Sequence, residues 1–167
     1  MCTIANSEFE TRPSDAGRFD LVFAATAWHW INPVTRHQRA WELLRPGKHL
    51  AFWSALHVIP ETGNSFDRPP RPGELRDYTD EISSSGLFDN TVVRHFDWEV
   101  TYTGDEYIGL LHTFSGHTTM HADQRNYLYS EIRRRLGQRS DGRLRRHWGA
   151  ALHIVRRMDK PAVTAPA

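Results

Sequence analysis

Four side chains that could do chemistry follow directly after an apolar run: Thr26, Trp28, His29 and Trp30. The run, Phe19–Ala25, has the character of a strand buried on both faces of a largely parallel sheet. Strands of an open α/β sheet point their carboxyl ends at the ligand crevice, so we expect the four side chains to line it. Aromatic faces attract cations, and His29 is the candidate general base. An equally weighted alternative is that His29 only satisfies hydrogen bonds below the crevice.

A second group of polar side chains lies at the end of an amphipathic segment. Thr103 and Glu106 have the spacing of a capping box, and the apolar stripe that follows predicts a short helix from Tyr107. The polar side chains near its end are His112, Thr113 and Ser115. We expect them to contact a substrate from above the crevice.

Two histidines raise the question of a metal site. His117 and His121 are four residues apart, and His112 is nearby. The segment lacks a third ligand and a glutamate in register, so no metal is expected.

Seven arginines between Arg133 and Arg146 form a basic stretch that could contact phosphates. No aromatic residues are interleaved to stack on bases, so a solvated helix face and loop explain the stretch better than an RNA-binding module. We therefore do not expect a nucleic-acid partner.

The elements around the first group alternate between strand and helix. Asn32-Pro33 predicts a helix start, and apolar spacing continues the helix from Pro33 to Leu44. Arg45-Pro46-Gly47 ends it, and Leu50–Trp53 begins another strand. This strand, helix, strand unit predicts an α/β fold with a right-handed crossover.

The second half continues with shorter elements. A proline-rich loop is predicted over residues 60–73, followed by a helix that Gly86 caps. Val92–Val100 alternates like a half-exposed strand. A helix through Leu128, Ile132 and Leu136 ends at Gly137, and Trp148–Val155 is the last strand.

Composition places the chain among ordinary globular proteins. It has 167 residues, enough for one domain, and a net charge of only +1, which gives no strong attraction to nucleic acid or anionic membranes. The single cysteine excludes an internal disulfide. No signal peptide or membrane-spanning run is visible, so we expect a cytoplasmic protein without a membrane partner.

The series from Phe19-Asp20-Leu21-Val22 through Trp28-His29-Trp30 to Leu44-Arg45-Pro46-Gly47 resembles the type-11 family of class I S-adenosylmethionine (SAM) methyltransferases. The resemblance covers residues 1–158, and residues 159–167 are expected to be a disordered tail. It implies a partial Rossmann-like α/β sheet with covering helices and a helical insertion before the last strand.

The resemblance also implies a function and a site. The reaction would be SAM-dependent methyl transfer to a small-molecule acceptor, with His29 as the catalytic residue. Thr26, Trp28 and Trp30 would bind the methionine end of the cofactor. Residues 4–10 would correspond to the end of the family's third strand, with Glu8 and Phe9 at the adenine. The alternative for this pair is a solvated glutamate and a core phenylalanine.

The sequence departs from the family at two places. Lys48 stands where a second glycine with positive φ is usual, at a cost of roughly 1 kcal/mol. No Gly-x-Gly loop precedes Phe19, so we expect a truncated product or a misplaced start codon, with weak or no activity alone. The strand Phe19–Ala25 then becomes a sheet edge, which a homodimer or a partner chain would cover.

Overall fold

The fold is built around one sheet in which the last described strand lies between two earlier ones. The computed structural model describes residues 8–13, 19–58 and 70–161. Four strands form one sheet in the order β1-β2-β4-β3. The strands are β1 (Phe19–Ala25), β2 (Leu44–Val58), β3 (Phe88–Thr103) and β4 (Arg143–Arg157).

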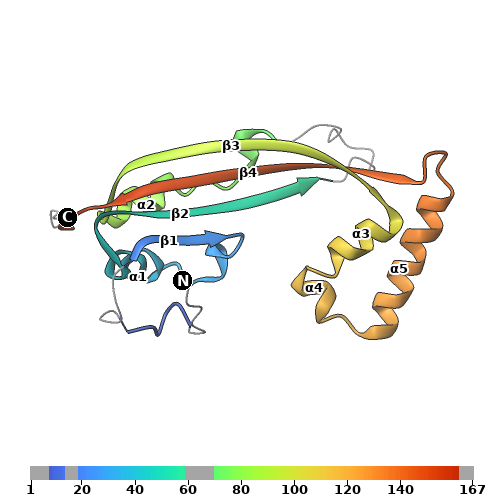
Figure 1. The fold of residues 1–167 in the computed structure, drawn as a ribbon, viewed down its shortest axis with the longest axis horizontal. Coiled ribbons are helices and arrows are strands. Elements are labelled where there is room, and N and C mark those ends of the chain that lie inside the picture. Colours follow the sequence, from blue (N-terminus) through green and yellow to red (C-terminus); the bar gives the residue numbers. More distant parts are fainter. Residues whose placement is uncertain (1–7, 14–18, 59–69, 162–167) are drawn as a thin grey trace. The chain divides into compact units, whose positions relative to one another are not determined.

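The parallel pair β1 and β2 is connected by α1 (Arg36–Leu43). Val22 lies opposite Leu50, and Ala24 lies opposite Phe52. Figure 1 shows β4 between β2 and β3 and running in the opposite direction to both. The predicted α/β class is confirmed, and the arrangement is a partial Rossmann-like sheet with a helical segment before its last strand.

The chain divides into two units. The first comprises residues 1–56, 71–96 and 149–167, and the second comprises residues 57–70 and 97–148. The long strands β3 and β4 contribute to both.

The core of the first unit lies on one face of the sheet. Leu50 and Phe52 of β2 pack there with Ala40 of α1 and with Ile82 of α2 (Thr79–Ser85). Gly86 ends α2 with a φ of 63°, as its predicted capping role requires.

The opposite face of β1 is exposed, which corrects the prediction of a strand buried on both faces. Leu21 is 54% exposed and Phe23 is 52% exposed, although the Phe23 and Trp53 rings form a T-shaped pair with centroids 5.2 Å apart. In the described part of the chain, helices α1 and α2 pack on the face of the sheet that carries Val22 and Ala24. The predicted edge position of β1 is confirmed, because β1 is the terminal strand of the sheet among those described.

Several predicted boundaries shift by a few residues. Helix α1 begins at Arg36 rather than Pro33, because residues 33–35 form a turn. Asn32 still starts this turn: its carbonyl accepts from Arg36 N at 2.9 Å, and its side chain accepts from Val34 N at 3.0 Å. Gly47 has a φ of 71°, whereas Lys48 does not have positive φ, so the predicted cost at Lys48 does not arise.

The second unit contains the helical segment. Its helices are α3 (Gly104–Leu111), α4 (Ser115–Thr118) and α5 (Ala122–Gly137). The capping box is confirmed: Thr103 Oγ1 accepts from Glu106 N at 3.3 Å, and Glu106 Oε2 accepts from Thr103 N at 2.8 Å. Tyr107 and Leu111 pack with Tyr129 and Leu136 in a core separate from that of the first unit.

Three sequence predictions fall wholly or partly on residues that the structure leaves undescribed. Of the loop predicted over residues 60–73, residues 60–69 lie outside the described ranges, and Pro72–Glu74 forms a short 3-10 helix. Of the tail, residues 162–167 lie outside them. In the segment assigned to a third strand, residues 4–7 lie outside, and residues 9–10 belong to a turn. None of the described helices is long and apolar enough to span a membrane.

Candidate functional site

The carboxyl end of β1 carries a strained residue. Thr26 has a φ of 48°, in the left-handed region that a β-branched side chain rarely adopts. Its amide donates to the carbonyl of Trp53 at 3.1 Å, and its hydroxyl donates to the carbonyl of Ala25 at 2.8 Å. Strained backbone of this kind concentrates at functional sites, so Thr26 remains a candidate on structural grounds.

The aromatic residues after Thr26 separate into a buried one and exposed ones. They form a 3-10 turn, Trp28–Trp30. Trp28 is 1% exposed and stacks on Phe52 with ring centroids 4.6 Å apart, whereas Trp30 is 75% exposed. His29 is also exposed, and its ring lies 4.7 Å from that of Trp30.

Trp28 therefore differs from its predicted role. A side chain with 1% exposure cannot lie against a cofactor, and the structure places this ring in the core. Trp28 acts instead as the anchor of the turn that presents His29 and Trp30 to solvent.

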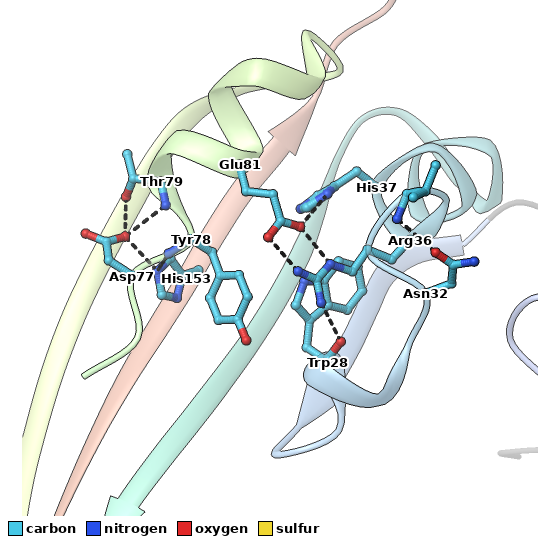
Figure 2. A network of polar contacts seen from close by, with 10 residues as sticks. Trp28, Asn32, Arg36, His37, Asp77, Tyr78, Thr79, Glu81 and His153 are labelled. Atoms are coloured by element: carbon cyan, nitrogen blue, oxygen red, sulfur yellow. Dashed lines mark hydrogen bonds and ion pairs between the residues drawn. The ribbon is translucent and has the colours of Figure 1, made fainter. Parts of the chain in front are cut away.

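A buried arginine binds the backbone of this turn (Figure 2). Arg36 Nη1 donates to the carbonyl of Trp28 at 3.0 Å. Its other nitrogens donate to the two carboxylate oxygens of Glu81, Nε at 2.7 Å and Nη2 at 2.5 Å. The guanidinium lies 5.6 Å from the Trp28 ring and 5.2 Å from the Tyr78 ring. The bidentate pair fixes the position of Arg36 and, through it, the Trp28 carbonyl.

His37 extends the same network. Its Nδ1 lies 3.3 Å from Glu81 Oε1, and the side chain is buried. Burial lowers the pKa of His37 to about 4, although the Glu81 carboxylate opposes this shift. His37 is therefore neutral at pH 7.

A second polar cluster in Figure 2 joins α2 to β4. His153 is completely buried, and its Nε2 lies 3.1 Å from Tyr78 N and 3.2 Å from Asp77 Oδ1. Hydrogen bonds from the Thr79 hydroxyl and amide lower the pKa of Asp77 to about 2. The His153 ring stacks on Phe52, so this cluster supports the same core residue that anchors Trp28.

The predicted adenine residues lie in the turn before β1. Phe9 is half-buried, and its ring meets the Trp28 ring edge-on at 6.3 Å. Its carbonyl accepts from Arg39 Nε at 3.2 Å. Glu8 is exposed, and its carboxylate accepts from the Thr11 hydroxyl at 3.4 Å. The structure thus brings Phe9 to the anchored turn and leaves the Glu8 carboxylate open to solvent.

The predicted substrate residues belong to the second unit. His112, Thr113 and Ser115 are all exposed. The His112 ring contacts Tyr129 edge-on at 5.0 Å, and the Thr113 hydroxyl donates to the carbonyl of Leu110 at 2.7 Å. Their contact with a substrate stays a prediction.

The other motifs in the second unit have structural roles. No set of three or more histidine, cysteine or acidic side chains able to hold a metal occurs among residues 8–13, 19–58 and 70–161. Arg133 pairs with Asp105, and both Arg134 and Arg135 pair with Glu131. Arg146 is buried and donates to the Tyr107 hydroxyl at 2.8 Å. Much of the basic stretch is thus paired within the unit.

Sequence reasoning missed Arg36 and Glu81. Arg36 shares the core-facing stripe of α1 with Ala40 and Leu43, and an arginine in such a stripe signals a buried partner. Glu81 is 45 residues away, on α2, and no local pattern points to it.

No protein-family model and no curated protein matches this chain. A proposed type II methyltransferase from Anaeromyxobacter dehalogenans is 23% identical, and the alignment covers 86% of this chain and 67% of that one, with a TM-score of 0.49. A proposed methyltransferase from Bacillus halodurans C-125 is 14% identical, and the alignment covers 91% of this chain and 70% of that one, with a TM-score of 0.47.

A proposed sarcosine dimethylglycine methyltransferase from Galdieria sulphuraria is 15% identical. The alignment covers 92% of this chain and 58% of that one, with a TM-score of 0.41. Likeness at this level of identity and TM-score assigns no activity. Over most of its length, the chain is similar to solved structures of methyltransferases and spans 67%, 70% and 58% of their lengths.

Proposed function

We propose that the chain is the C-terminal part of a SAM-dependent methyltransferase that acts on a small molecule. The observation that carries this proposal is the anchored turn at the end of β1. Strained Thr26 and buried Trp28 fix a turn that exposes His29 and Trp30 at the carboxyl end of a parallel strand, where open α/β sheets bind ligands. The ordered motif series of the sequence supports the same reaction.

The exposed residues of the turn fit the chemistry of the cofactor. Methyl transfer is an in-line displacement at a sulfonium, so the protein must align the reactants and, for a hydroxyl or amine acceptor, remove a proton. The open face of Trp30 suits a sulfonium cation. His29 would accept the proton at a ring nitrogen.

The remaining predicted residues complete the proposed site. Glu8 would accept from the adenine amine, and Phe9 would pack near the base. His112, Thr113 and Ser115 would contact the acceptor. A glycine-rich segment outside this sequence would supply backbone amides to the cofactor, so the chain by itself would bind SAM weakly or not at all.

Calorimetry with SAM and S-adenosylhomocysteine tests the proposal on two proteins. One is the chain as given, and the other is extended by the sequence encoded upstream in the same reading frame. The extended protein is expected to bind both ligands, and ligand at 100 times Kd would stabilise it by about 2.7 kcal/mol. An upstream sequence without a strand that ends in Gly-x-Gly, or an extended protein that binds neither ligand, would contradict the proposal.

The Trp30→Ala variant tests the site itself. A cation–π contact favours the sulfonium over the neutral thioether, so the variant should weaken SAM about threefold to tenfold more than S-adenosylhomocysteine. Trp98→Ala is the matched control, because Trp98 is also exposed, at 41%, but lies in the second unit. Equal losses of affinity for the two ligands would exclude a contact between Trp30 and the sulfonium.

The exposed edge of β1 favours a second candidate function, pairing with another chain. Among the described strands β1 is terminal, and its Leu21 and Phe23 are more than half exposed, an arrangement that natural sheets usually protect. Size-exclusion chromatography with light scattering distinguishes the outcomes. A well-folded monomer at micromolar concentration would exclude self-pairing, and a dimer that Phe23→Lys dissociates would support it.

A further inference from the structure

The second unit contains a cavity that the proposed function does not use. Its volume is about 360 Å³, within the range of small-molecule sites. Six mainly apolar side chains from α3, α5 and the start of β4 line it: Tyr107, Leu111, Leu128, Ile132, Leu136 and Leu144. A hydrophobic lining of this extent favours a ligand with an apolar body.

Two polar side chains complete the lining. His117 is half-buried, stacks on Tyr129 at 5.9 Å, and lies with Nδ1 3.4 Å from the Tyr129 hydroxyl. Arg135 is largely exposed and donates from Nε to Glu131 Oε1 at 2.8 Å. Tyr129 thus holds the His117 ring in place, and Arg135 provides a guanidinium in the lining.

The charge around Arg135 is positive in sum. Glu131 accepts from Arg135 and also from Arg134, at 2.6 and 2.8 Å. One carboxylate therefore neutralises only one of two guanidiniums. The remaining positive charge beside an apolar cavity is complementary to a single anionic group on an otherwise apolar molecule.

We propose that this cavity binds a small amphipathic anion, with its carboxylate at Arg135 and its apolar body against Leu128, Ile132 and Leu136. The volume equals roughly a dozen water molecules in the liquid, which corresponds to a ligand of about ten to twelve non-hydrogen atoms. This inference is independent of the proposed methyl transfer.

Titration of the full chain with sodium octanoate, followed by calorimetry and by NMR of its methyl groups, tests the inference. Octanoate should bind at one site and more tightly than 1-octanol, which has the same chain length without the charge. The methyl resonances of Leu128, Ile132 and Leu144 should shift together. Shifts confined to Leu21 and its neighbours on β1, or no saturable binding at millimolar octanoate, would overturn it.

Two arginine variants separate a specific contact from general surface charge. Arg135→Gln should weaken octanoate about threefold to fivefold and leave octanol unchanged, because an exposed charge contributes little. Arg133→Gln is the matched control: Arg133 lies on the same helix, pairs with Asp105 rather than Glu131, and does not line the cavity. Equal losses in the two variants would overturn the contact with Arg135. The methyl shifts of the unaltered chain decide the location if a variant does not fold.

Discussion

Replacement of Glu81 by glutamine removes the charge that neutralises a buried guanidinium. The side chain of Arg36 is 2% exposed, so its charge stays out of water after the carboxylate is lost. A buried charge left without its partner costs about 3–5 kcal/mol of unfolding free energy. The Glu81 side chain is 33% exposed, so water can approach from that side. We therefore expect Glu81→Gln to lose about 3 kcal/mol, at the lower end of the range.

Replacement of Arg36 by methionine should cost less. The carboxylate left behind is one-third exposed and can be hydrated, and the methionine can fill the space between the Trp28 and Tyr78 rings. The main loss is the hydrogen bond to the Trp28 carbonyl, worth about 1–2 kcal/mol. The double variant should be close to Arg36→Met alone, because Glu81 has no buried cation left to neutralise.

Urea unfolding of the four proteins at pH 7 measures the coupling between the two residues. Circular dichroism and tryptophan fluorescence should give coincident transitions before free energies are compared, because the chain divides into two units. The reasoning is refuted if Glu81→Gln is no less stable than Arg36→Met, since Arg36 would then not be held away from water.

Acidification and a change in backbone strain give two further predictions. Burial lowers the pKa of His37 to about 4, so between pH 6.5 and 4 the unfolded chain binds a proton that the folded chain does not. The free energy of unfolding should fall by about 3 kcal/mol as the pH decreases through this window. Urea unfolding at a series of pH values measures this change, and a His37→Phe variant with the same dependence of stability on pH would contradict the assignment. Thr26→Gly relieves a left-handed cost of about 1–2 kcal/mol and adds about 0.5–1 kcal/mol of chain entropy, so it should gain about 0.5 kcal/mol. Thr26→Val keeps the β-branched shape and loses the hydroxyl. If thermal unfolding shows Thr26→Val to be more stable than Thr26→Gly, backbone strain at this position is excluded.

Local signals predicted the elements that depend on neighbouring residues. The strand Phe19–Ala25 agrees with the structure because its apolar run is a local signal, although its partners lie on β2. The Thr103 capping box agrees because its two hydrogen bonds join residues three apart. The end of α2 at Gly86 agrees for the same reason. Helix α1 starts later than predicted because a proline after Asn32 suits a turn as well as a first helical position.

Long-range contacts were beyond prediction from the sequence. Nothing in the spacing of Trp28, His29 and Trp30 indicates which ring enters the core, since that depends on Phe52 across the sheet. The exposed face of β1 was missed because an apolar run does not reveal whether a helix covers each side. The contact of Arg36 with Glu81 joins two helices that no local pattern connects.

The position of β4 has a consequence for how the chain folds during synthesis. β4 is the last of the described strands to be made, yet it lies between β2 and β3. The end of β4 and the residue after it exchange hydrogen bonds with α1: Arg157 Nε donates to the Trp41 carbonyl, and Trp41 Nε1 donates to the Met158 carbonyl. These partners are 117 and 116 residues apart, and contacts between residues so distant in sequence slow folding. A nascent chain that has not yet released β4 from the ribosome carries two strands without their shared neighbour. Unpaired strand edges of this kind are prone to aggregation until translation reaches Arg157.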